Sequence, residues 1–522
     1  MNARALSIGV ALLALNALLV LPDRLLGVTP GAFLRVGAET LLILALLALT
    51  PVRWQKAMRG LGVAVLMAAI ALKIGNTGTY LAFDRPIDLA LDLPLIPKGF
   101  DLLTRSHGIA YALGAVLGGI VAVAAVAAAG AWALRRVTFV WRMPVAAGVL
   151  AAALIGLAVA LPGVSRATAQ VFADEAHIVA EGFRTTRIFA GELSHDPLAA
   201  VAPPQLLRTL QGHDVLVVFV ESYGRVAVDA PRYASIAAQL DRMTERLSAA
   251  GFASRSAWLG SPTFGGESWL AHSTTMSGLW VNDQRRYNML IGSKRTTLLS
   301  DFSRAGWRTA VVMPEITMEW TEASFFRPDV MYDAPALDFR GEPFTYITMA
   351  DQFTLSKFQR MELAKADRKP VMAEIALVSS HAPWTPLPKP VPWDQVGDGH
   401  IFDTAREGPT PEELWEEPED VRAQYGRSIS YVLETLESFV LTHATEKTVL
   451  IVLGDHQPMS FVSGEDATRD VPVHVIAKDP AVTAAIADWH WTDGMRPTAQ
   501  SPQWKMDALR TRIVTSFSGP AP

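Results

Sequence analysis

Cysteine is absent from the 522-residue chain, and so are basic runs, internal repeats and low-complexity tracts. Without cysteine there are no disulfide bonds, no metal sites built from thiolates and no cysteine nucleophile. A chain without thiols suits an oxidising compartment. The net charge of −5 and the lack of a basic stripe argue against the electrostatic surface with which proteins bind nucleic acid, so no nucleic-acid partner is expected.

Hydrophobic residues, by contrast, make up half of the chain, and the long apolar runs all fall within residues 1–161. The hydrocarbon core of a bilayer is about 30 Å thick, which a helix of roughly 20 apolar residues crosses. Five segments approach this length, so residues 1–161 are predicted to form a transmembrane domain of five helices. The predicted spans are Ala5–Leu21, Leu34–Thr50, Leu61–Phe83, Ile109–Leu134 and Met143–Leu161.

The first span has the length of a signal peptide and follows Arg4. No small-residue cleavage site comes after it, and residues 22–24 lead on to the next span, so a retained helix is predicted. Lys73 lies within the third span, where an ionisable residue is a functional candidate. The glycines that follow it favour instead a helix that ends near Leu72, with Lys73 extending to the membrane interface.

Basic residues set the predicted orientation, because short cytoplasmic loops carry an excess of lysine and arginine. The loops after the second and fourth spans are purely basic, whereas the loop 84–107 mixes both signs. Both basic loops lie in the cytoplasm only if the N-terminus does, and five spans then carry the rest of the chain to the periplasmic or extracellular side. The prediction is a multi-pass protein of the cell (inner) membrane. The basic residues are Arg53, Lys56 and Arg59, and Arg135, Arg136 and Arg142.

Beyond the spans, residues 162–205 are predicted to be a juxtamembrane connector with a helix over Arg166–Phe189, and residues 206–522 a water-soluble domain. In that domain, short apolar runs typical of strands alternate with helical patterns. This alternation predicts an α/β domain with a mostly parallel central sheet covered on both faces. The expected strands are Val215–Val220, Thr309–Met313, Val371–Val378, Thr448–Leu453 and Val471–Ile476, and the expected helices include Tyr233–Leu247 and Gln424–Leu441.

Polar side chains stand just past three of these strands, where sites form in open α/β sheets. Glu221 follows the first strand, His381 the third, and the pair Asp455-His456 the fourth. Ser268 begins an expected helix after a glycine-rich loop, at an end where backbone N–H groups favour an anion. Singly, such residues are more often caps or turns than catalytic groups. Together they supply oxygen and imidazole ligands that suit Mn²⁺, Mg²⁺ or Zn²⁺.

At these residues the chain resembles the alkaline phosphatase and sulfatase superfamily, in particular its membrane-anchored branch of lipoteichoic acid synthases and phosphoglycerol transferases. The resemblance implies an enzyme whose catalytic domain lies outside the cytoplasm. It implies that Glu221, Ser268, Asp455 and His456 hold one divalent metal, with Mn²⁺ preferred over Mg²⁺ or Zn²⁺. Ser268 is then the nucleophile, and His381 contacts the phosphoryl oxygens or protonates the leaving group.

Two positions depart from the pattern of that branch. Trp320 falls near a tryptophan that binds the head group in the family, but Glu322 stands where a basic residue is expected nearby. Ser268 stands where the branch has threonine. The residues after Ser268 lack the Pro or Ala and the Arg that accompany conversion to formylglycine in true sulfatases, so an unmodified serine is predicted. Ser261 and Thr263 are alternative nucleophiles.

Two further histidines have more than one interpretation. His474 lies in the last expected strand, where it is either a buried core residue or an additional ligand, as in related enzymes that use two metals. His272, one turn after Ser268, is expected either to pack in the core or to support the ligand residues without touching the metal. The sequence leaves the number of metals open.

The expected function is transfer of a phosphoryl group of the phosphoglycerol type, or cleavage of a phosphodiester, through a covalent intermediate on Ser268. A bound divalent metal lowers the pKa of a hydroxyl and so provides a nucleophile near neutral pH. A membrane anchor favours a phospholipid head group as donor, with an envelope glycan, a lipid or water as acceptor. The alternatives are a sulfuric or phosphate ester hydrolase and an inactive binding homologue.

Overall fold

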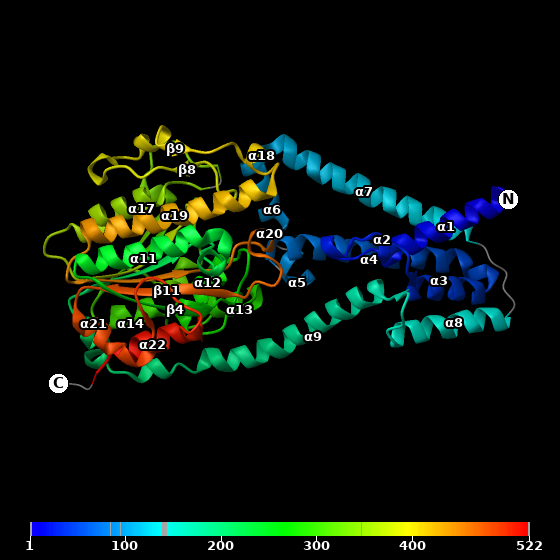
Figure 1. Cartoon of the computed structure of the whole chain (residues 1–522). Coiled ribbons are helices and arrows are strands. Elements are labelled where there is room, and N and C mark those ends of the chain that lie inside the picture. Colours follow the sequence, from blue (N-terminus) through cyan, green and yellow to red (C-terminus); the bar gives the residue numbers. More distant parts are fainter. Residues whose placement is uncertain (1–2, 84, 94–95, 138–142, 346, 520–522) are drawn as a thin grey trace. The chain divides into compact units, whose positions relative to one another are not determined.

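The computed structural model describes residues 3–83, 85–93, 96–137, 143–345 and 347–519. Residue contacts divide the chain into two compact units, Met1–Thr185 and Thr186–Pro522, and the boundary falls inside helix α9 (Ala167–Ser194). Figure 1 traces the elements of each unit along the chain.

The first unit is almost entirely helical. Its segments Val52–Leu81 and Ile109–Arg136 are long and apolar enough to cross a membrane, and three further helices are apolar but shorter. Leu113, Leu117 and Ile120 of the second segment are more than half exposed, which is unfavourable in water and favourable against lipid. The helices are α1 (Ala3–Val20), α2 (Pro30–Phe33), α3 (Ala38–Leu49), α4 (Gln55–Phe83), α5 (Leu89–Asp92), α6 (Ile96–His107), α7 (Ile109–Arg136) and α8 (Met143–Ala158).

Two expectations for this unit need correction. The segment expected to span from Leu34 is helical only from Ala38, because Val36–Gly37 (β1) pairs with Val164–Ser165 (β2). The third helix does not end near Leu72, since α4 continues to Phe83.

Lys73 is consequently buried rather than extended to an interface, with 1% of its surface exposed. Its ammonium donates hydrogen bonds to the Leu19 carbonyl at 2.6 Å and to the Thr168 hydroxyl at 3.0 Å. The last carbonyls of a helix have no partner within the helix, and Lys73 supplies one to α1. Lys73 therefore joins α1, α4 and α9.

The second unit is built on a nine-stranded sheet in the order β12-β4-β11-β10-β3-β7-β5-β6, with β13 also paired to β4. Neighbouring strands from β10 to β6 are parallel, whereas β11 is antiparallel to both of its neighbours. The predicted α/β fold with a mostly parallel sheet is confirmed. The strands are β3 (Asp214–Val220), β4 (Ala253–Gly260), β5 (Arg308–Met313), β6 (Val330–Asp333), β7 (Val371–Leu377), β10 (Thr448–Gly454), β11 (Asp470–Ala477), β12 (Thr492–Asp493) and β13 (Gln503–Lys505), with β8 (Leu387–Pro388) and β9 (Arg406–Glu407) as a separate pair.

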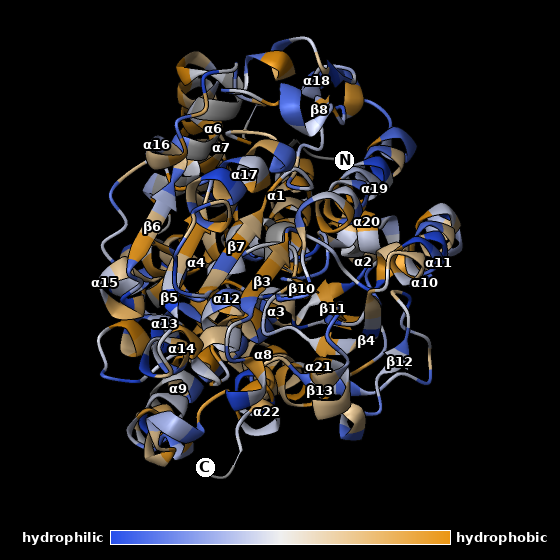
Figure 2. Ribbon diagram, turned by 90° about the vertical axis from the view of Figure 1, so that its left-hand side faces the viewer, coloured by the Kyte–Doolittle hydropathy of each residue, from blue (hydrophilic) through white to orange (hydrophobic). Residues whose placement is uncertain are grey.

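Helices cover both faces of this sheet, and each face has its own apolar core. In β3, Leu216 and Val218 join the core under α11, α17 and α19, while Val217 and Phe219 join the core under α12, α14 and α22. Burial on both faces explains why the strand is a continuous apolar run, and Figure 2 shows it in the orange of apolar residues. The helices are α10 (Val226–Asp229), α11 (Ala234–Ala249), α12 (Ser268–Ser277), α13 (Gln284–Ile291), α14 (Leu298–Arg304), α15 (Ala323–Phe326), α16 (Ala334–Leu337), α17 (Asp351–Phe358), α18 (Pro411–Leu414), α19 (Pro418–His443), α20 (Ser460–Ser463), α21 (Pro480–Ala485) and α22 (Ala508–Phe517).

Candidate metal centre and nucleophile

Glu221 and Asp455 follow two neighbouring parallel strands, β3 and β10. The register of these strands pairs Val220 with Gly454, so the residues after them emerge side by side at the same edge of the sheet. The two loops approach so closely that a Cβ atom on Gly454 would lie 2.0 Å from the Tyr223 carbonyl oxygen. Only glycine fits there, and this close approach brings the two carboxylates together.

Glu221, Asp455 and His456 form a buried group in which one ligand atom from each lies within 4.8 Å of the others. His456 Nε2 is 3.4 Å from Glu221 Oε1 and 3.6 Å from Asp455 Oδ2. Asp455 Oδ1 accepts hydrogen bonds from the backbone N–H groups of Ser222 at 2.8 Å and His456 at 2.6 Å. Oδ2 is thereby left facing the group.

The protonation states of this group fit a divalent cation. His456 Nδ1 lies 2.8 Å from the Gln457 carbonyl, which can only accept, so Nδ1 carries the proton and Nε2 keeps its lone pair. Burial lowers the pKa of His456, which keeps the imidazole neutral. Burial and the charge of Glu221 raise the pKa of Asp455 well above its usual value. Among the described residues, the only basic side chain within 4 Å of either carboxylate is this neutral imidazole, so a metal ion is the group that would let both carboxylates ionise.

Ser268 is the first residue of α12, and its hydroxyl reaches the same group. Its Oγ lies 3.0 Å from Glu221 Oε2 and 3.1 Å from His456 Nε2. The helix N-terminus favours negative charge at this oxygen. Glu267, just before it, has a φ of +61°, and Ser222, beside Glu221, has a φ of +56°. Such left-handed residues cost on the order of 1–3 kcal/mol each and cluster at functional sites.

The loop that carries Ser268 is tied to the loop after β10. The Ser261 hydroxyl donates to the Asp455 carbonyl at 2.6 Å, and the Gly265 N–H donates to the Gln457 carbonyl at 2.9 Å. The Thr263 hydroxyl donates to a carbonyl within its own loop. Ser261 and Thr263 therefore use their hydroxyls to hold backbone, whereas Ser268 directs its hydroxyl at the acidic group.

His381 follows β7, the other neighbour of β3. The preceding Ser380 hydroxyl donates to the Glu221 carbonyl at 2.6 Å and so joins the two loops. Burial lowers the pKa of His381, but the charges of Glu315 and Glu221 outweigh it, and the net shift is upward. The ring is therefore cationic over a wider pH range than a free histidine.

His474 and Trp320, the two remaining candidates, contact other parts of the domain. His474 is fully buried in the middle of β11, with Nδ1 2.7 Å from the Ser256 hydroxyl and Nε2 3.3 Å from the Tyr223 hydroxyl. Both ring nitrogens are thus occupied by protein groups, as expected for a core histidine. Trp320 stacks on Phe326, with 5.4 Å between ring centroids, at the edge of an apolar core.

Two acidic residues near the site were not anticipated. Glu315 follows β5, and its carboxyl has a buried oxygen, Oε1, without a hydrogen-bond partner among the described residues. Burial raises the pKa of Glu315 to about 7. Glu374, buried within β7, lies 2.9 Å from Nδ1 of His272, which stacks on Phe219 at 3.8 Å. Glu315 stands just past a strand, as Glu221 does, and Glu374 is the single acid in an apolar run. Both positions could therefore have been recognised from the sequence.

Asp351 binds the backbone just before His381, and its burial leads to a prediction about stability. Its Oδ1 accepts hydrogen bonds from the N–H groups of Val378 at 2.7 Å and Ser379 at 3.1 Å, while Oδ2 has no described partner. Burial raises the pKa of Asp351 to about 7. Because the folded-state pKa lies above the unfolded value of about 3.9, the folded chain binds the extra proton between those values. Stability contributed by this proton is present at low pH and is lost as pH rises towards 7.

We expect Asp351→Asn, which keeps the acceptor oxygen, to raise the melting temperature at pH 8 and to raise it less at pH 5, where most of the proton-linked stability is still present. The expected gain is a few kcal/mol, with about 4 kcal/mol as an upper bound from the size of the shift. Thermal unfolding of the full chain across pH 5–8 measures it. Asp479→Asn is the control, because backbone contacts lower the pKa of Asp479 and its removal should give no gain at pH 8. An identical pH profile in wild type and Asp351→Asn would contradict the prediction.

A family model described as sulfatase matches residues 213–474, about half of the chain, and no match was found among curated proteins. The lipoteichoic acid synthase LtaP from Listeria monocytogenes is similar in structure, with 13% identity, 58% of this chain and 71% of that chain covered, and a TM-score of 0.38. The soluble domain of lipooligosaccharide phosphoethanolamine transferase A from Neisseria meningitidis is also similar, with 13% identity, 61% of this chain and 93% of that chain covered, and a TM-score of 0.38.

A third similar structure is the Streptococcus pyogenes phosphoglycerol transferase GacH, with 13% identity, 65% of this chain and 91% of that chain covered, and a TM-score of 0.35. The family model begins just before β3 and ends within β11, so it contains every residue of the buried acidic group and Ser268. The chain is an enzyme of the sulfatase family, within the alkaline phosphatase superfamily.

Proposed function

We propose that this enzyme transfers or cleaves a phosphodiester, of the phosphoglycerol type, through a covalent intermediate on Ser268. One observation carries the proposal: the Ser268 hydroxyl lies within hydrogen-bonding distance of both Glu221 and His456 at a helix N-terminus. Glu221 or His456 can accept the proton of a hydroxyl in that position, and the helix N-terminus favours the negative charge that remains on the nucleophile.

Glu221, Asp455, His456 and Ser268 would hold one divalent metal, with Mn²⁺ preferred, and the bound metal would lower the pKa of the Ser268 hydroxyl. Ser268 Oγ then forms a bond to phosphorus as the bond to the leaving oxygen breaks. His381 contacts the phosphoryl oxygens or gives its proton to that oxygen. An acceptor alcohol or water displaces Ser268 in the second step and restores its hydroxyl.

A phosphodiester is favoured over a sulfate ester by the residues around Ser268. Trp269, Leu270 and Ala271 follow it, and no arginine stands within this turn, so the context of formylglycine formation is missing. We expect the purified full chain with Mn²⁺, Mg²⁺ or Zn²⁺ to hydrolyse an aryl phosphodiester, and an aryl sulfate of the same aryl group at least tenfold more slowly, roughly 1.4 kcal/mol in activation free energy. Faster turnover of the sulfate would favour the sulfuric ester hydrolase, and no turnover of either with metal bound would favour the inactive binding homologue.

We also propose that residues 1–161 cross the cell membrane five times, that residues 162–205 are a juxtamembrane connector, and that residues 206–522 act outside the cytoplasm. The support is the apolar length and exposure of α7 and the purely basic loops. A domain held at the membrane surface meets phospholipid head groups at high local concentration, which favours a lipid donor and an envelope glycan, lipid or water as acceptor.

Topology reporters test this arrangement. Fusions after Arg136 and after Gln211 should report opposite sides of the membrane, with Arg136 in the cytoplasm, because arginine-rich short loops remain there. A fusion after Arg59 serves as the control for the cytoplasmic signal. Cytoplasmic signal at both Arg136 and Gln211 would contradict the five-span topology while leaving the chemistry of the second unit untouched.

A further inference from the structure

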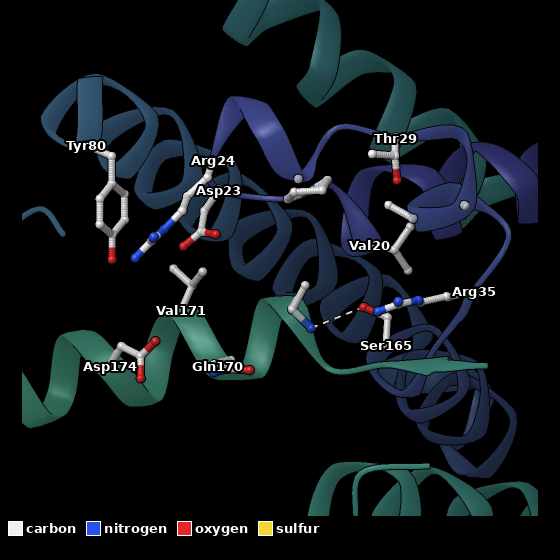
Figure 3. Close-up of a pocket in the computed structure, with 15 residues that line it drawn as sticks. Val20, Asp23, Arg24, Thr29, Arg35, Tyr80, Ser165, Gln170, Val171 and Asp174 are labelled. Carbon is white, nitrogen blue, oxygen red and sulfur yellow. Dashed lines mark hydrogen bonds between the residues drawn. The ribbon is translucent and has the colours of Figure 1, made fainter. Parts of the chain in front are cut away.

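The first unit contains a pocket of about 610 Å³ near the end of α1. Side chains from the loop after α1, from α4, from β2 and from the start of α9 line it, as Figure 3 shows. Val20 and Val171 contribute apolar surface and are 2% and 4% exposed. None of its lining residues belongs to the group around Ser268, so the pocket is a separate feature of the chain.

Two arginines supply the positive side chains of the pocket. The guanidinium of Arg24 lies over the Tyr80 ring, 3.8 Å from its centroid. Arg35 directs its guanidinium towards Ser165 on the other side of the pocket (Figure 3). Arg35 forms no ion pair or side-chain hydrogen bond with the described residues, and the Ser165 hydroxyl lies near it (Figure 3). An unpaired guanidinium beside a hydroxyl donor matches the oxygens of a phosphate group.

Two aspartates also line the pocket, and they differ in their hydrogen bonding and exposure. Asp23 accepts a hydrogen bond from the Asn76 amide at 2.9 Å. Asp174, on α9, has an exposed carboxylate at the end of the pocket away from Arg35 (Figure 3). The two arginines and two aspartates leave the pocket without net charge. A ligand that carries both a phosphate and an ammonium group would therefore satisfy Arg35 and Asp174 together.

The surroundings of the pocket are apolar. Leu25, Val28 and Leu34, which flank the lining residues along the chain, are 57%, 47% and 84% exposed. Large apolar side chains exposed together in this way need a partner, and acyl chains supply one. Polar contacts fix the walls, because Lys73 binds α1 to α9 and the Asn16 side chain accepts the Gly37 N–H at 2.8 Å. A pocket with charged side chains of both signs and an apolar rim suits an amphiphile.

We propose that this pocket binds the head group of a zwitterionic phospholipid of the phosphatidylethanolamine type, with its phosphate at Arg35 and its ammonium at Asp174. The proposal rests on the membrane location in the proposed function and is independent of the chemistry at Ser268. The lipid's acyl chains lie against the exposed apolar residues between Leu25 and Val36.

Lipid retention by the full chain tests the proposal without any catalytic step. Protein in detergent is mixed with equal amounts of dioleoyl phosphatidylethanolamine, dioleoyl phosphatidylglycerol and dioleoylglycerol, passed through gel filtration, and analysed for bound lipid by mass spectrometry. Wild type should retain phosphatidylethanolamine above phosphatidylglycerol and both above dioleoylglycerol. Arg35→Gln should lower retention of both phospholipids about tenfold, the loss expected for a charge-assisted hydrogen bond. Asp174→Asn should remove the preference for phosphatidylethanolamine.

Three controls separate this site from the rest of the protein. Arg53→Gln removes an exposed arginine of the same unit outside the pocket and should retain lipid like wild type. Arg35→Lys, which keeps the charge, should retain an intermediate amount. Turnover of a soluble aryl phosphodiester should be unchanged in Arg35→Gln. Failure of the lipid proposal would therefore appear in the retention assay, and failure of the proposed function in the turnover assay. Equal phospholipid retention by wild type and Arg35→Gln would overturn the proposal.

Discussion

Replacement of Ser268 by alanine should lower kcat for an aryl phosphodiester by a factor on the order of 10³ or more, the loss typical for removal of an enzyme nucleophile. The reason is geometric, since Ser268 Oγ is the hydroxyl that contacts both Glu221 and His456. Steady-state hydrolysis with saturating Mn²⁺ measures the effect. The melting temperature should change little, because the side chain removed is small and partly exposed.

Matched variants make this result specific. Ser261→Ala and Thr263→Val remove the two alternative hydroxyls, which hold backbone carbonyls, and should reduce kcat far less than Ser268→Ala. Ser268→Thr keeps a hydroxyl at the same position and should retain measurable turnover. Loss of activity in Thr263→Val together with full activity in Ser268→Ala would move the nucleophile to Thr263.

The second large effect is expected for the metal. Asp455→Asn should weaken retention of Mn²⁺ by more than about 100-fold. Mutation of a residue that only hydrogen-bonds to a metal ligand lowers metal affinity by about 10–100-fold, and loss of a ligand itself should lower it further. Asparagine keeps the oxygen that accepts the N–H groups of Ser222 and His456 and removes the charge. Elemental analysis of the purified variant gives the metal content directly.

The choice of asparagine follows from the structure. Asp455→Ala would leave two buried N–H groups without an acceptor, at about 1–3 kcal/mol each, so lost metal and lost stability would be confounded. Asp470→Asn is the control, since Asp470 is a buried acid of the same domain that pairs with Arg225 outside the site. Full metal occupancy in Asp455→Asn would contradict the proposed ligand set.

The strand-end residues were predictable from sequence because apolar runs on both faces of a parallel sheet are conspicuous. Glu221 and Asp455 stand immediately after such runs, and the strand order in the structure brings them side by side. β4 escaped prediction because Ser254, Arg255 and Ser256 interrupt its apolar pattern. Their polar groups find partners that only the folded chain provides, such as the hydrogen bond between Ser256 and His474.

Long-range partners also explain the other differences. Nothing near Lys73 in the sequence indicates that Leu19 and Thr168 will surround its ammonium, so extension to an interface was the simpler local interpretation. The role of His474 was open for the same reason, since Tyr223 and Ser256 lie more than two hundred residues away along the chain. Local patterns therefore predicted the elements and the strand ends, whereas the satisfaction of buried polar groups required the fold.

The central claim is that Ser268 itself becomes covalently attached to phosphorus during turnover. The direct measurement is mass spectrometry of the peptide containing Ser268 after brief incubation of the full chain, loaded with Mn²⁺, with an aryl phosphodiester and an acid quench. We expect a phosphorus-containing group on Ser268, absent from Ser268→Ala and from protein quenched before substrate is added. Formylglycine at position 268, or rapid turnover with the modification on Thr263 or on no residue, would contradict it.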